Sequence, residues 1–176
     1  LLVYHDGKVD GVSIEKNAYS AFKDFRIANG EPIPTLDQYL EQGKKYPETM
    51  LVYELKPHSS KEVEEKFVNL TISKLKEHDL LDPERVMFIS FSLYICERLA
   101  ALLPEFTVQF LGSSKSPAEL AKLGINGVDY NHAVYTLHKK WYSQARKNRM
   151  SVNAWTVNAD SDMKRMIKMG DDSPWQ

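Results

Sequence analysis

An acidic and a basic side chain alternate at the end of one short apolar segment, residues 50–56. If this segment is a β-strand, Glu54 and Lys56 lie on one face and Leu55 on the other, because side chains alternate across a strand. Ligands of α/β folds bind at the carboxyl ends of strands, where this pair would lie. The pair therefore predicts a binding or catalytic site, although a plain ion pair on a solvated strand fits the same spacing.

A second candidate, His5, follows an apolar start and precedes Asp6 and Gly7. Histidine can donate or accept a proton near neutral pH. Asp6 can orient the imidazole, or it can form a turn with Gly7. The three residues alone fit a surface turn as well as a catalytic histidine.

Two aromatic residues lie near the predicted ends of other strands. Phe91 stands between Ser90 and Ser92, where a strand gives way to a helix and Ser92 fits the helix N-cap. Trp155 lies within the segment 151–157. A tryptophan in a strand is usually part of the core, but it can also form an apolar wall against the carbon skeleton of a ligand. Periodicity does not choose between these roles.

Strands alternating with helices must position these side chains. The strands are predicted at six apolar segments: 1–5, 50–56, 86–91, 107–111, 126–130 and 151–157. Thr35 with Gln38, and Ser116 with Glu119, form capping boxes that predict helix starts. The connection 11–34 interrupts the alternation of strands and helices, and residues 14–28 within it have some helical character. This order indicates an α/β fold with a parallel sheet, either open and doubly wound or part of a (β/α)8 barrel. A full barrel takes about 250 residues.

Composition excludes several classes of protein. The 176 residues predict a single domain over 1–176, and a net charge of −1 without a basic stripe argues against nucleic-acid binding. No apolar run is long enough for a transmembrane segment. Cys96 is the single cysteine, which excludes a disulfide framework and a cysteine zinc cluster. No signal peptide is recognised, and both a periplasmic or secreted and a cytoplasmic location stay open.

The motifs occur in an order that resembles the glycerophosphodiester phosphodiesterase family. Along the chain they are Leu2-Val3-Tyr4-His5-Asp6, Ile33-Pro34-Thr35-Leu36, Glu54-Leu55-Lys56, Ser90-Phe91 and Asn153-Ala154-Trp155-Thr156-Val157-Asn158. Each motif alone is weak, but five in order over nearly the whole chain make the resemblance specific.

The resemblance implies a fold, a reaction and a set of site residues. It favours the (β/α)8 TIM barrel over the open sheet. It implies metal-dependent hydrolysis of glycerophosphodiesters, products of phospholipid breakdown, to glycerol phosphate and an alcohol. Glu54 would bind a divalent metal, Mg²⁺ or Ca²⁺, and Lys56 would contact the phosphate. His5 would be one of two catalytic histidines, and Phe91 and Trp155 would line the pocket beside the glycerol.

The resemblance also predicts which segments of the family this chain lacks. The family opens with a His-Arg-Gly strand and a Glu-x-Asp pair of metal ligands, which would precede Leu1, and it closes with a strand for which residues 171–176 are too polar. We therefore expect a barrel lacking its first strands and its last one, whose open sheet edges make the chain either melt at low temperature or self-associate into a homo-oligomer. Two alternatives stay open: a catalytically incomplete module that binds phosphate esters, and a phosphodiesterase like the phosphatidylinositol phospholipases.

Overall fold

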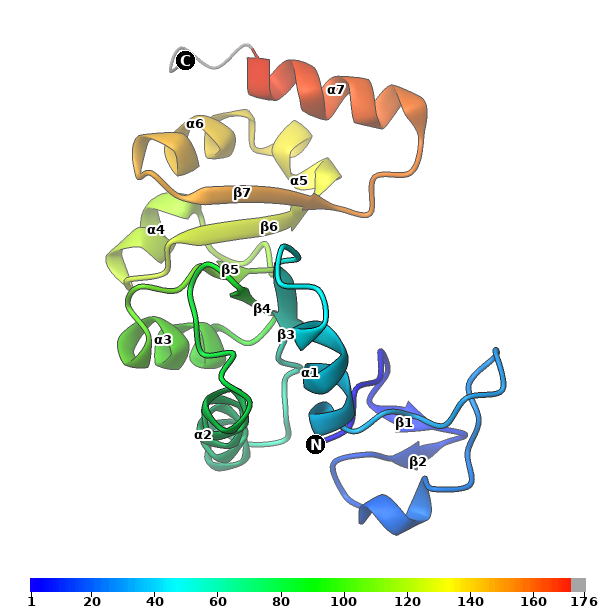
Figure 1. The fold of residues 1–176 in the computed structure, drawn as a ribbon. Helices are drawn as coiled ribbons and strands as arrows, with labels where there is room; N and C mark the ends of the chain where they lie inside the picture. The colour runs from blue at the N-terminus through cyan, green and yellow to red at the C-terminus, as the bar shows by residue number, and fades with distance from the viewer. Residues whose placement is uncertain (172–176) are drawn as a thin grey trace. The chain divides into compact units, whose positions relative to one another are not determined.

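A computed structural model describes residues 1–171 of the chain as two compact units (Figure 1). The first unit comprises Leu1–Leu51 and His58–Arg85, and the second comprises Val52–Pro57 together with the chain from Val86 onward. Residues 171–176 were predicted to be too polar for the last barrel strand. All of them after Asp171 lie outside the described residues.

The first unit begins with a small antiparallel hairpin rather than with the predicted strand 1–5. Leu2 forms an isolated bridge to Thr35, while strand β1 (Lys8–Val9) pairs with β2 (Val12–Ser13). Positive φ angles at Asp10 (48°) and Gly11 (81°) form the tight turn between them. The prediction for 1–5 was wrong because the facing segment offers a bridge instead of a continuous ladder. Of the helical character expected over 14–28, the structure has the short 3₁₀ helix Tyr19–Ala21.

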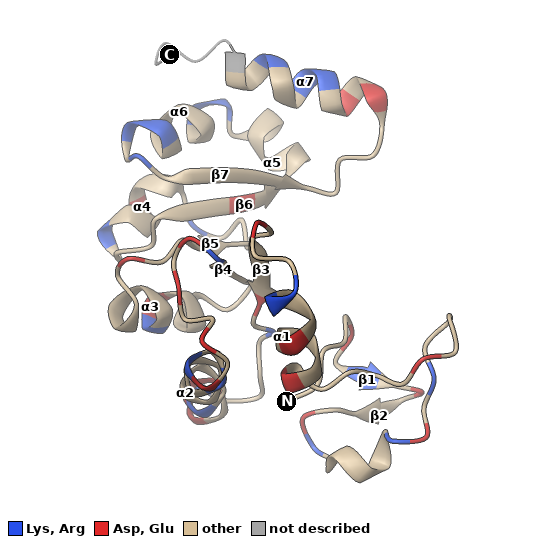
Figure 2. Ribbon diagram, in the orientation of Figure 1, with Lys and Arg blue, Asp and Glu red and all other residues tan. Residues whose placement is uncertain are grey.

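Two helices complete this unit. Helix α1 (Leu36–Lys44) begins at the predicted capping box, where the Thr35 side chain accepts a hydrogen bond from the Gln38 backbone N–H and Gln38 Oε1 accepts one from the Thr35 N–H. Helix α2 (Lys61–Glu77) is capped by Ser60 and ends at His78. Lysine and acidic residues, blue and red on the ribbon of Figure 2, are interspersed along α2, as expected for a solvated helix face.

The second unit is a parallel sheet whose strands follow one another in chain order. The strands are β3 (Leu51–Glu54), β4 (Val86–Ser90), β5 (Val108–Phe110), β6 (Gly127–Asn131) and β7 (Ser151–Trp155), in the order β3-β4-β5-β6-β7. Strand β3 is parallel to β4. The Leu51 N–H donates to the Arg85 carbonyl and the Leu55 N–H donates to the Ile89 carbonyl, so the partner moves four residues forward when the donor does. A doubly wound sheet reverses its strand order at a switch point. Strict chain order is the barrel arrangement and excludes the open-sheet alternative.

Helices follow the strands of this sheet. They are α3 (Leu93–Leu102), α4 (Pro117–Lys122), α5 (His132–Leu137), α6 (Lys139–Lys147) and α7 (Asp160–Asp171). The predicted caps Ser92 and Ser116 begin α3 and α4. Within residues 1–171, no helix has the length and apolar character needed to cross a membrane.

The two faces of the sheet differ in polarity. One face packs apolar side chains against the helices, for example Phe88, Val128 and Tyr130, each with 0% exposure. Many of the alternate positions carry polar groups, while Val52, Met87 and Ile89 among them are apolar. We call the second face, which bears Glu54, Gln109, Asp129, Ser151 and Asn153, the polar face of the sheet. A barrel interior is normally filled by branched apolar residues, so this polarity marks a functional surface.

Candidate active site

Glu54 and Lys56 lie side by side at the carboxyl end of β3, as the alternation predicted. The Lys56 Nζ atom is 2.8 Å from Glu54 Oε1, and about one third and one quarter of the respective side chains are exposed (33% and 26%). Among the described residues, Glu54 Oε1 is buried and has this ion-pair contact but no hydrogen bond. The carboxylate therefore keeps coordination capacity for a further cation or donor.

A hydrogen-bonded amide and hydroxyl network forms the middle of the polar face. Gln109 Nε2 donates to Ser151 Oγ at 3.1 Å, and Asn153 Nδ2 donates to Gln109 Oε1 at 3.1 Å. Both bonds pass over β6 at Gly127. A Cβ atom at Gly127 would lie 2.4 Å from Ser151 Oγ and 2.5 Å from Gln109 Cγ, so the network requires glycine there. Paired residues of parallel strands share a face, and the Gln109–Gly127–Ser151 register places the network on the same face as Asp129.

Asp129 is a buried carboxylate that the sequence analysis did not single out. The residue is 9% exposed, and its Oδ1 atom is buried without a hydrogen bond within residues 1–171. Burial, and secondarily the charge of Glu54, raise the pKa of Asp129 from 3.8 to about 6. The signal in the sequence was a single acidic residue inside the otherwise apolar strand 126–130. Burial is thus the main cause of the raised pKa of Asp129.

Phe91 and Trp155 contact each other in the same unit. Their ring centroids are 5.6 Å apart in an edge-to-face arrangement, and Phe91 is 43% exposed. The Trp155 Nε1–H donates to the Asp129 backbone carbonyl at 2.9 Å, which fixes the indole against β6. The structure therefore supports a partly exposed aromatic wall at the carboxyl ends of β4 and β7, instead of a tryptophan buried in the core.

His5 belongs to the first unit, whereas the other four predicted site residues belong to the second. Its Nδ1 atom is 2.7 Å from Asp6 Oδ1, and the two side chains are 87% and 69% exposed. Of the two roles predicted for Asp6, this contact corresponds to the orienting role. The pair can present the Nε2 atom of His5 to a solvent-borne ligand.

Comparisons with known proteins agree with this architecture. The family model described as the glycerophosphoryl diester phosphodiesterase family matches residues 1–173. A glycerophosphodiester phosphodiesterase from Parabacteroides distasonis is 36% identical with a TM-score of 0.92, covering 96% of this chain and 70% of that chain. A search of curated proteins gave no match.

More distant solved structures share the fold. An Oleispira antarctica phosphodiesterase in complex with the product sn-glycerol-3-phosphate has a TM-score of 0.80 at 22% identity, covering 96% of this chain and 72% of that chain. A glycerophosphodiester phosphodiesterase from Agrobacterium tumefaciens has a TM-score of 0.71 at 18% identity, covering 95% and 73%. The curled five-stranded parallel sheet matches the TIM barrel of these proteins, which confirms the predicted fold class. The chain belongs to the glycerophosphoryl diester phosphodiesterase family and is by class a phosphoric diester hydrolase.

Proposed function

We propose that this phosphodiesterase hydrolyses glycerophosphodiesters to glycerol phosphate and an alcohol, with a divalent cation, Mg²⁺ or Ca²⁺, bound at Glu54. The observation that carries the proposal is the Glu54–Lys56 pair at the carboxyl end of a barrel strand, in a chain of this family. The product complex of the Oleispira antarctica protein supports a glycerol phosphate product.

The residues present fit a divalent cation. Glu54 Oε1 is a buried carboxylate oxygen without a hydrogen bond among the described residues, and oxygen ligands are those that Mg²⁺ and Ca²⁺ prefer. Within residues 1–171, no three carboxylate, imidazole or thiol groups come together. Among the described residues, Glu54 would therefore be the carboxylate that this chain supplies to such an ion. Such an ion neutralises phosphate charge.

The protein groups would divide the remaining tasks. Lys56 donates to phosphoryl oxygens as they gain negative charge, from a position already fixed by the ion pair with Glu54. His5, oriented by Asp6, donates a proton to the departing alcohol as a general acid. Phe91 and Trp155 contact the apolar edge of the glycerol and exclude water from it.

The test measures hydrolysis of glycerophosphocholine by the 176-residue chain with Mg²⁺, with Ca²⁺ and with a chelator. We expect little or no hydrolysis by this chain alone, and, in a chain that also carries the His-Arg-Gly and Glu-x-Asp segments of the family, activity with a metal that is lost with the chelator. Glu54→Gln should weaken metal binding and activity together, while His5→Ala should lower kcat about 10²- to 10⁴-fold and leave metal affinity unchanged. Glu105→Gln, which alters an exposed carboxylate of the same unit, is the control.

Three results separate the alternatives. Metal-independent hydrolysis would contradict the role of Glu54. Binding of glycerophosphocholine without turnover would identify the chain as a phosphate-ester binding module. Faster cleavage of intact phosphatidylinositol than of soluble diesters would favour the phospholipase-like reaction.

We also propose that the chain self-associates. In the described part of the chain, β3 and β7 are the outer strands of the sheet and pair on one side each. Unpaired strand edges are templates for pairing with another chain. Size-exclusion chromatography with light scattering over a range of concentrations should show a dimer or larger species, and a monomer at all concentrations would refute the proposal.

A further inference from the structure

Asp129 has a buried carboxylate oxygen for which the sheet supplies no donor. The residue lies on β6 and is 9% exposed, and its Oδ1 atom is buried without a hydrogen bond among the described residues. Its register partner on β7, Asn153, carries an amide donor, but the Nδ2 atom of that amide donates to Gln109 Oε1 at 3.1 Å. A buried polar group without a partner is costly, so its presence indicates a donor that comes from outside the chain.

The groups around this carboxylate indicate the kind of donor. The indole of Trp155 reaches Asp129 from β7, since its Nε1–H donates to the Asp129 backbone carbonyl at 2.9 Å. Trp155 is the register partner of Asn131, two positions after Asp129, so alternation places the carboxylate, the Asn153 amide and the indole on one face. An aromatic ring beside a carboxylate and an amide suits a small polyol, because the ring packs against carbon atoms while the polar groups bind hydroxyls.

We propose that Asp129 binds a free hydroxyl group of the glycerol moiety and thereby selects diesters whose glycerol is not acylated. This inference rests on the proposed function, since it extends the contacts of Phe91 and Trp155 with the glycerol. A hydroxyl donates to the buried carboxylate oxygen, whereas an ester oxygen at the same place has no hydrogen to donate. A site built around such a bond rejects an analogue that lacks the hydroxyl, because the buried acceptor then stays unpaired.

Binding of two small phosphate monoesters measures this selection without depending on turnover. The ligand sn-glycerol 3-phosphate carries free hydroxyls, and ethyl phosphate carries the same phosphate on a chain without them. Isothermal titration calorimetry of the 176-residue chain in Mg²⁺ gives the ratio of the two affinities. We expect the wild type to prefer glycerol phosphate about tenfold or more. Asp129→Ala should abolish this preference, and Asp129→Asn, which keeps an oxygen acceptor without its charge, should keep part of it; neither should change the affinity for ethyl phosphate.

Controls address folding and the phosphate contact. Asp129→Asn removes a buried charge and leaves the backbone carbonyl that Trp155 uses, so it should melt no lower than the wild type. Asp162→Asn alters a carboxylate of the same unit that lies 2.7 Å from Arg165, and it should change neither affinity. Lys56→Met tests the phosphate contact of the proposed function and should weaken both ligands equally.

The outcomes separate this inference from the proposed function. If Lys56→Met weakens both ligands and Asp129→Ala keeps the preference for glycerol phosphate, hydroxyl binding at Asp129 is refuted and the phosphate contact stands. If Asp129→Ala loses the preference and Lys56→Met changes nothing, the inference stands and the role of Lys56 is refuted. A wild type that shows no preference, or that binds neither ester, refutes the inference. Tighter binding of O-phosphoethanolamine than of glycerol phosphate, lost in Asp129→Ala, would also refute it, because the carboxylate would then bind an ammonium group.

Discussion

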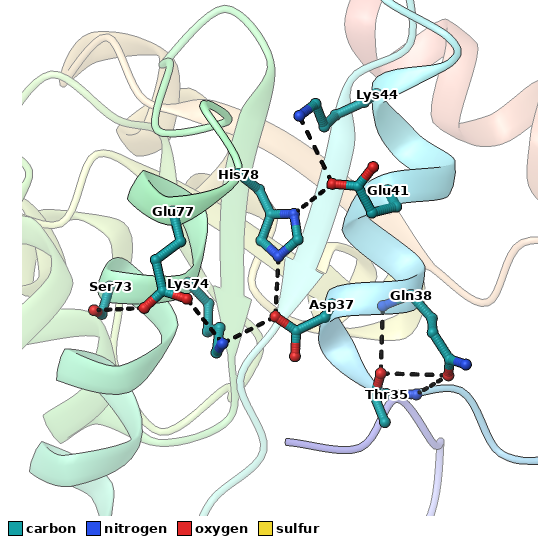
Figure 3. Close-up of polar contacts among 9 residues, drawn as sticks. All are labelled: Thr35, Asp37, Gln38, Glu41, Lys44, Ser73, Lys74, Glu77 and His78. Atoms are coloured by element: carbon teal, nitrogen blue, oxygen red, sulfur yellow. Dashed lines mark hydrogen bonds and ion pairs between the residues drawn. The ribbon is translucent and has the colours of Figure 1, made fainter.

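The imidazole of His78 joins α1 to the end of α2, and its charge makes this joint sensitive to pH. His78 Nε2 is 3.0 Å from Asp37 Oδ1, and Nδ1 is 2.8 Å from Glu41 Oε1 (Figure 3). Both ring nitrogens can donate at once only when the imidazole is protonated. Lys74 also contacts Asp37, at 2.9 Å, so the joint is a small network of alternating charges.

Opposite pKa shifts set the pH range in which the joint stabilises the fold. Hydrogen bonds to Asp37 and Glu41 raise the pKa of His78 above 6.5, so its contribution is complete below that pH and is lost as pH rises through the folded pKa. Hydrogen bonds from His78 and then Lys74 lower the pKa of Asp37 from 3.8 to about 2, so its contribution is lost as pH falls below 3.8. The joint should be strongest between about pH 4 and pH 6.5.

The size of the effect follows from the Asp37 pKa and its exposure. Taken fully, a fall from 3.8 to about 2 corresponds to about 2.5 kcal/mol. The Asp37 side chain is 46% exposed, and solvent screens its interactions. We therefore expect the network to contribute about 0.5–1 kcal/mol to the free energy of unfolding.

Urea unfolding of the wild type and His78→Gln over this pH range measures the contribution. The variant should be less stable by about 0.5–1 kcal/mol near pH 5.5, and the difference should shrink well above pH 6.5. His138→Gln is the matched control, because the His138 ring stacks on Trp141 with a centroid distance of 4.0 Å. A stability difference that stays constant with pH, or grows above neutrality, would refute the charge-based account.

Three further substitutions test the second unit. Gly127→Ala should destabilise the chain by about 1–3 kcal/mol in denaturant unfolding, because its Cβ would clash with Ser151 Oγ and Gln109 Cγ; unchanged stability would mean that these side chains can move apart freely. Leu99→Ala should cost about 2–5 kcal/mol in the same assay, since Leu99 is 0% exposed in α3, and a smaller loss would indicate a core that relaxes into the cavity. Lys56→Met should lower kcat about 10²- to 10³-fold with a smaller effect on KM, measured with glycerophosphocholine, and an equal kcat would remove Lys56 from charge stabilisation.

Much of the fold was predictable because local signals coincide with tertiary structure here. Capping boxes at Thr35 and Ser116 predicted the starts of α1 and α4, and the apolar segments predicted the five strands of the sheet to within one or two residues at most ends. The segment 1–5 has the same apolar character but forms no strand, because a strand needs a partner and Leu2 meets only Thr35. The choice between barrel and open sheet depended on the order of the strands in the sheet. The spacing of apolar residues along the chain gives no information on that order.

The candidate site was predictable only where its chemistry lies within one strand. Glu54 and Lys56 are two positions apart, so alternation alone places them together. Asp129 was not predicted because its role depends on residues of other strands. It lies 75 positions after Glu54 in the chain, and only the register of the sheet places the two carboxylates on a common face. Within 126–130, an acidic residue looks like a tolerated exception in an apolar run.

The polar face shows why such an exception should be interpreted as function. Gln109 and Asn153 satisfy each other, and Ser151 accepts from Gln109, so the amides and the hydroxyl meet their hydrogen-bonding needs within the sheet. Asp129 on the same face does not, since its Oδ1 atom is buried without a hydrogen bond among the described residues, whereas Glu54 Oε1 has the Lys56 ammonium group 2.8 Å away. A fold selected for stability alone would have replaced these carboxylates by apolar residues or amides. A buried carboxylate without a protein partner, next to a network that satisfies itself, therefore indicates a functional rather than a stabilising residue at Asp129.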